Sequence, residues 1–154
     1  MNEGHPRMTA PATPDALRPR VPPPLRSVIA VCAGIFVGAL MIYFFERLGH
    51  LVVAPPAIPN PADPASVRAA MAGMTVANFL MLLVAYLFGT TVGCWLTARM
   101  APSRALAHAG VVGAIFLAGG ISNFVKLPHP VWFVIASLLA FAVAPFLGTR
   151  MSGR

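Results

Sequence analysis

The chain has 154 residues, of which 58% are hydrophobic and only 10% are charged, and its formal net charge is +7. A soluble domain carries about 25% charged residues, so this composition argues against an ordinary soluble enzyme and favours a protein embedded in a lipid bilayer. The positive charge does not indicate a nucleic-acid partner, because most of the arginines flank apolar runs and no basic patch is interleaved with aromatic residues.

Residues 1–26 are rich in proline and arginine and hold too few apolar side chains to bury a core. We interpret them as a disordered, basic tail. Four apolar segments follow, and each supplies roughly the 17 to 25 residues that cross about 30 Å of hydrocarbon. They cover approximately residues 28–53, 74–96, 105–125 and 131–147. The predicted fold class is therefore all-α, an integral membrane four-helix bundle.

The breaks between the segments carry turn and capping residues. Asp63 and Pro64 are typical of an N-cap followed by proline at the first helical position, and the helix begun there is expected to run on into the second span with a bend at Gly73. Ser103 is the predicted cap of the third span. Pro145 predicts a kink near the end of the fourth.

The lysines and arginines are distributed unevenly about these spans. With the N-terminus in the cytoplasm, the inner side would carry Arg7, Arg18, Arg20, Arg26, Arg99, Arg104, Arg150 and Arg154, and the outer side Arg47, Arg68 and Lys126. The positive-inside rule then predicts that both termini are cytoplasmic. The proline-rich loop 54–73 would face outward.

This topology brings the polar residues of the spans toward the outer face. A candidate outer pocket comprises Glu46, His50, Asn78, Asn123 and His129. Glu46 and His50 are four residues apart and share one helix face. Twenty residues from Val28 use up the hydrocarbon thickness, so Glu46 is expected at the interface. Arg47, Lys126 and Trp132 are expected to contact lipid headgroups or lie in the aromatic belt.

Three interpretations of these outer residues stay open. They are interfacial and capping groups, with His129 in a rigid turn between two prolines; or they form a pocket for a ligand, an ion or a lipid headgroup; or His50 and His129 hold a haem. The expected cofactor content is none, because nothing fixes the spacing of the two histidines, and no metal-ligand spacing occurs. One carboxylate and two histidines without a nucleophile predict no catalytic site.

Small residues recur at four-residue spacing along the spans. Gly34 with Gly38, and Gly89 with Gly93, form GxxxG motifs that let helix backbones approach closely in a membrane. Asn78 lies about 20° around its helix from Gly89, taking about 100° per residue. It is therefore expected to make an interhelical hydrogen bond.

The segments "ERLGH", "DP…AAMA" and "PHPVWF", in this order and spacing, resemble small bacterial inner-membrane proteins with four predicted spans and no assigned activity. The resemblance covers about residues 28–150. It implies a four-span topology in the inner membrane and draws attention to Glu46, His50 and His129.

The sequence thus predicts a multi-pass protein of a bacterial inner membrane that is not an enzyme. The preferred function is an accessory or structural subunit of a membrane assembly, whose partners are the bilayer and other membrane subunits or a second copy of itself. The alternative is a small carrier, or a protein that binds a ligand or an ion in the outer polar pocket.

Overall fold

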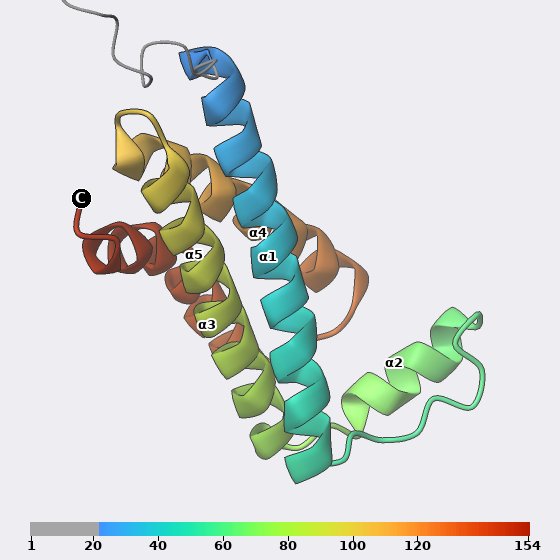
Figure 1. Ribbon diagram of the computed structural model, residues 1–154. Coiled ribbons are helices and arrows are strands. Elements are labelled where there is room, and N and C mark those ends of the chain that lie inside the picture. Colours follow the sequence, from blue (N-terminus) through green and yellow to red (C-terminus); the bar gives the residue numbers. More distant parts are fainter. Residues whose placement is uncertain (1–21) are drawn as a thin grey trace, which may run out of the picture.

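The structure of the protein, a computed structural model, describes residues 22–154, and this part of the chain is helical without any strand. Figure 1 shows the long helices packed together and a short helix that lies to the side of them. In chain order the helices are α1 (Pro23–Val52), α2 (Pro64–Ala72), α3 (Val76–Met100), α4 (Ala105–Lys126) and α5 (Val131–Met151). The predicted all-α four-helix bundle is confirmed.

Helix α1 begins earlier than predicted. It starts at Pro23 rather than Val28, with proline in its first turn, where the missing N–H needs no partner. The last residues of the predicted tail are therefore helical, while residues 1–21 of that tail lie outside the described part. The helix ends at Val52, and Val53 adopts an extended backbone.

The predicted continuous helix through Gly73 is wrong. Asp63 caps α2 as expected, since its carboxylate accepts hydrogen bonds from the backbone N–H groups of Ala65 at 3.0 Å and Ser66 at 3.1 Å. Helix α2 then stops at Gly73, and Thr75 opens α3 with a capping box that it shares with Asn78. A strong local cap therefore makes α2 a separate helix inside the predicted loop 54–73, and α3 begins at Val76 rather than at residue 74.

Ser103 does not cap α4. The N-cap is Arg104, whose backbone is left-handed with a φ of 45° and whose side chain makes no capping bond. The Arg104 carbonyl oxygen instead accepts the N–H of Ala107 at 2.9 Å and the ring Nδ1 of His108 lies 3.1 Å from it. Helix α5 continues across Pro145 to Met151, four residues beyond the predicted end at 147.

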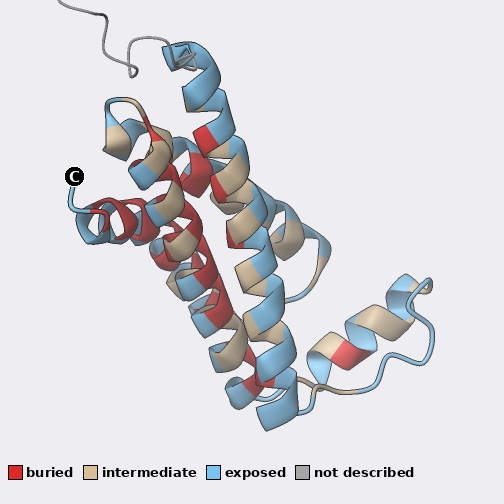
Figure 2. Cartoon of the chain, in the orientation of Figure 1, coloured by how far each residue is buried: buried red, intermediate tan, exposed pale blue. Residues whose placement is uncertain are grey.

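Helix α3 is the centre of the bundle. It packs against α1, α4 and α5, whereas α1 and α5 do not contact each other. Figure 2 shows the buried residues concentrated along α3 and the faces that adjoin it. Two clusters form this core: Phe79, Tyr86, Phe133 and Phe141 in one half, and Cys94, Ala98, Ala109 and Val112 in the other.

The two predicted GxxxG motifs face each other across the contact between α1 and α3. A Cβ atom added to Gly93 would lie 2.5 Å from the carbonyl oxygen of Gly34 and 3.0 Å from the Cα of Gly38. One added to Gly89 would lie 3.0 Å from the carbonyl oxygen of Gly38. Side chains cannot fit at these distances, so the glycines allow direct backbone contact, as predicted. We call Gly34, Gly38, Gly89 and Gly93 the glycine seam.

All four long helices have the length and hydropathy of membrane spans, with mean hydropathies of 1.7 to 2.6 over their most apolar windows. Their outward faces carry large apolar side chains, such as Phe36, which is 71% exposed, and Leu139, which is 61% exposed. Lipid tails supply the apolar surroundings that such faces require. The protein is thus a small multi-pass membrane protein, and the bilayer is its first partner.

Candidate functional site

The two ends of the bundle differ in their side chains. The start of α1, the connection between α3 and α4 and the end of α5 form the arginine end, which carries Arg26, Arg99, Arg104, Arg150 and Arg154. Two hydrogen bonds join these segments. Arg26 Nε donates to the Met100 carbonyl at 2.9 Å, and Arg154 Nη1 donates to the Ala101 carbonyl at 2.6 Å. The opposite end, which we call the pocket end, holds the end of α1, helix α2 and the start of α3.

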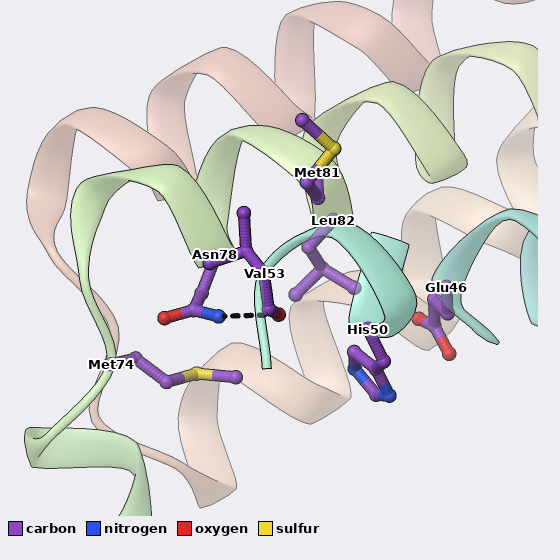
Figure 3. Close-up of a pocket in the computed structure, with 7 residues that line it drawn as sticks. All are labelled: Glu46, His50, Val53, Met74, Asn78, Met81 and Leu82. Atoms are coloured by element: carbon purple, nitrogen blue, oxygen red, sulfur yellow. Dashed lines mark hydrogen bonds between the residues drawn. The ribbon is translucent and has the colours of Figure 1, made fainter. Parts of the chain in front are cut away.

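A small cavity lies between α1 and α3 at the pocket end. It is lined by Glu46, His50, Val53, Met74, Asn78, Met81 and Leu82 and has a volume of about 20 Å³. We call it the Glu46 cavity. Figure 3 shows the Glu46 and His50 side chains projecting from successive turns of α1, with the α3 residues opposite them. The predicted sharing of one helix face by Glu46 and His50 is confirmed.

Glu46 and His50 have different surroundings within this cavity. The Glu46 side chain is half-buried, whereas His50 is exposed and also lines a groove on the outside of α1 with Arg47 and Phe44. No hydrogen bond or ion pair joins Glu46 to His50 in the structure. His50 therefore borders both the Glu46 cavity and the outer groove without a direct contact to the carboxylate.

Asn78 lines the cavity, and its side chain links the start of α3 to the residues that follow α1. Its Nδ2 donates to the carbonyl oxygens of Val53 at 3.1 Å and Ala54 at 3.4 Å, just after the end of α1. Its Oδ1 accepts from the N–H of Thr75 at 2.9 Å. The predicted hydrogen bond to another helix is therefore made to the residues that directly follow α1 rather than to α1 itself. Because both ends of the amide are used, Asn78 has little capacity left for a ligand.

Asn123 and His129 do not line the Glu46 cavity, so the structure corrects the predicted five-residue pocket. The Tyr86 side chain on α3, which the sequence argument had not selected, lies in the neighbourhood of Asn123 and Glu46. A tyrosine in an apolar run was the available signal, because a buried phenol usually finds a polar partner.

His129 belongs to an aromatic cluster. Its ring stacks on Phe133 with centroids 5.5 Å apart and an interplanar angle of 15°, and Phe79 and Phe124 meet it edge-on. Its Nδ1 lies 2.8 Å from the Leu127 carbonyl oxygen, which fixes the turn between α4 and α5. His50 and His129 thus occupy different environments, and the structural interpretation of His129 as part of a rigid turn fits its contacts.

The predicted interfacial residues lie at the pocket end. Arg47 and Lys126 are exposed near the last turns of α1 and α4, and Trp132, which is 39% exposed, meets Phe79 edge-on at the start of α5. Their contact with lipid headgroups stays a prediction.

The volume of the Glu46 cavity limits what it can hold. A single water molecule needs roughly 10–15 Å³ of such space, whereas pockets for small organic ligands measure about 300–1,000 Å³. At about 20 Å³ the cavity fits one water-sized occupant. An organic ligand or a whole lipid headgroup does not fit this space.

Comparisons of the chain with protein-family models, with curated proteins and with solved structures find no match. Within residues 22–154 the fold is a small bundle with four helices that have the length and composition of membrane spans, and Glu46 is the acidic residue within these helices.

Proposed function

We propose that this protein is a non-enzymatic subunit of a membrane assembly in a bacterial inner membrane, with the arginine end in the cytoplasm. The observation that carries the proposal is a face of α4 that residues 22–154 leave uncovered. Gly110, Ala114, Ala118 and Ser122 follow one another at four-residue spacing along α4, and we call them the α4 small-residue face. Ala114, Ala118 and Ser122 are exposed.

The glycines of the spans separate into two groups by what surrounds them. A Cβ added at any member of the glycine seam would collide with a neighbouring helix, and one at Gly148 would lie 2.6 Å from the backbone nitrogen of Trp95. A Cβ added at Gly110 or Gly119 would meet nothing within 4 Å. Small residues at this spacing favour close helix contacts in membranes. The α4 small-residue face therefore has the composition of a helix contact, and no partner for it lies within the described part of the chain.

A groove beside this face supports a protein partner. It has a volume of about 300 Å³ and runs between α4 and α5, with Gly110 and Ala114 on one side and Pro145 and Phe146 on the other. Packing between helices in lipid depends on van der Waals contact. A partner helix could place a large side chain in the groove and its backbone against the small residues. Both placements add van der Waals contact.

The charge distribution supports the proposed orientation. Of the basic residues that the structure describes, five lie at the arginine end and Arg47, Arg68 and Lys126 lie toward the other end. Cytoplasmic segments are enriched in lysine and arginine. With Cys32 and Cys94 replaced by alanine, a cysteine at Ala62 should react with an impermeant maleimide added to intact cells, and one at Ser103 should not. The reverse labelling pattern would overturn the orientation.

The proposed function is tested by purifying the tagged full-length chain in mild detergent from its own host and measuring the mass of the particle. We expect a particle larger than the monomer, containing either a second copy or other membrane proteins. The double variant Gly110→Leu/Ala118→Leu should lose the partner at unchanged expression, because both positions open outward. Ala39→Leu on the exposed face of α1 is the matched control and should keep it. A monomeric parent chain would contradict the proposal.

The alternative, a carrier or an ion-binding protein, is favoured by one observation, the carboxylate at the Glu46 cavity. The volume of that cavity restricts the occupant to a species about the size of one water molecule.

A further inference from the structure

Glu46 is unusual among the acidic residues of this chain. The sequence has four of them, and Glu3 and Asp15 lie outside the described residues. Asp63 caps α2 beyond the spans. Glu46 is thus the acidic side chain that the structure places within a span.

Glu46 lies inside helix α1 rather than at its end. It is six positions before the last helical residue, Val52, which corresponds to about 9 Å along the helix axis. Tyr86 lies ten residues inside α3, about 15 Å from the start of that helix. A charged side chain is costly within a membrane helix and less so toward the ends of the helix. Retaining a carboxyl group at this position calls for a compensating role.

The groups around Glu46 do not include a permanent positive charge in contact with it. On α1 the titratable neighbour is His50, and Arg47 is exposed on another side of the helix. Helix α3 contributes the Tyr86 phenol together with Met81 and Leu82. Helix α5 does not contact α1. If Glu46 were permanently ionised, it would therefore lack a counter-ion in contact with it. If Glu46 were permanently protonated, it would not need a cavity beside it.

We propose that Glu46 is a reversible proton-binding site inside the membrane, loaded and emptied through the Glu46 cavity past His50. The carboxylate takes one proton to become the acid, and no other bond changes. The cavity has room for one water-sized species beside Glu46, and His50 lines both the cavity and the groove outside α1. A water in the cavity and the imidazole thus form a short proton route from the pocket end. This inference concerns the single chain and holds whether or not the chain is a subunit of an assembly.

The test uses dicyclohexylcarbodiimide, an apolar reagent that partitions into the bilayer and reacts with protonated carboxyl groups. The acid adds across one C=N bond of the reagent: its oxygen bonds to the central carbon, its proton moves to nitrogen, and the O-acylurea rearranges to a stable N-acylurea. The full-length protein in liposomes is treated over a range from mildly acidic to mildly alkaline pH. The site of modification is then mapped by mass spectrometry.

We expect Glu46 to be modified at acidic pH, with a labelling rate that falls about tenfold per pH unit above the midpoint of its titration. Asp63 is the internal control, because it lies beyond the spans and should react with a water-soluble carbodiimide instead. Glu46→Gln should abolish labelling, and His50→Ala should alter the pH profile of Glu46 while leaving Asp63 unchanged. Failure of Glu46 to react at any pH, or a labelling rate independent of pH, would overturn the proposal.

Discussion

The glycine seam and the α4 small-residue face share a sequence pattern but differ in their use. Both place small residues four apart on a membrane helix. In the seam, the backbones of α1 and α3 come so close that a Cβ on Gly93 would lie 2.5 Å from the Gly34 carbonyl oxygen. On α4, a Cβ on Gly110 would meet nothing within 4 Å. A four-residue spacing of small residues therefore predicts a surface against which a helix can pack. It does not predict whether that helix comes from the same chain, which depends on the fold.

The largest expected difference between the two regions comes from adding one methyl group. Gly93→Ala should lower the free energy of unfolding by about 1–3 kcal/mol, because the new Cβ would overlap the backbone of α1 and separate the helices. The measurement is thermal or dodecyl sulfate unfolding of the purified protein in detergent. A stability equal to that of the parent would show that α1 and α3 are not in backbone contact.

Asn78→Ala removes a second connection between α1 and α3, at the pocket end. The substitution deletes the donor to the Val53 and Ala54 carbonyls and the acceptor for the Thr75 N–H. We expect a loss of about 1–3 kcal/mol, since buried polar groups lose their partners. Hydrogen exchange should increase at the end of α1 and the start of α3 while the arginine end keeps its protection. An increase at both ends alike would argue against a local connection.

Thr97→Val is expected to have a smaller effect on the same contact. Thr97 Oγ1 lies 2.9 Å from the Gly93 carbonyl oxygen and 3.2 Å from that of Ala30 on α1, and it is fully buried. Interhelical hydrogen bonds in membranes average about 0.6 kcal/mol, so valine should cost roughly that amount. A double-mutant cycle with Gly93→Ala should show coupling, because the two residues act on one seam. If the two changes in unfolding free energy were strictly additive, Thr97 and Gly93 would act independently of each other.

Gly110→Ala should have the smallest effect on stability of the purified monomer. Its Cβ enters open space, and alanine favours helix over glycine by up to about 1 kcal/mol in water. The expected result is unchanged or slightly raised thermal stability in detergent. A loss of stability comparable to that of Gly93→Ala would mean that α4 is already packed at this position. It would contradict the distinction between the glycine seam and the α4 small-residue face.

Much of the fold could be predicted because membrane burial imposes a simple length and hydropathy rule. The four spans follow from it. The Asp63 cap follows instead from local side-chain chemistry, and the close contacts at small residues follow from their size. The helix ends could not be predicted as well, because they depend on local competition. Thr75 and Asn78 form a capping box that starts α3 afresh, and Arg104 takes a left-handed backbone in place of a Ser103 cap.

The candidate site was predictable only where its residues share a helix. Glu46 and His50 are four residues apart, so α1 alone brings them together. Which residues of the other helices meet Glu46 depends on the rotation of α3 and α4 about their axes, which hydropathy does not determine. The structure brings Tyr86 toward Glu46, and it places His129 in the aromatic cluster of Phe79, Phe124 and Phe133.

Photocrosslinking in intact membranes tests the central claim, that the α4 small-residue face contacts another protein. A photoreactive amino acid is placed at Ala118 and, in a separate chain, at Ala39, which is exposed on α1. After illumination, the α4 position should yield a discrete adduct with the mass of a second protein chain, and the α1 position should yield lipid adducts. Lipid adducts alone at both positions would contradict the claim and leave the α4 face as an ordinary lipid-facing surface.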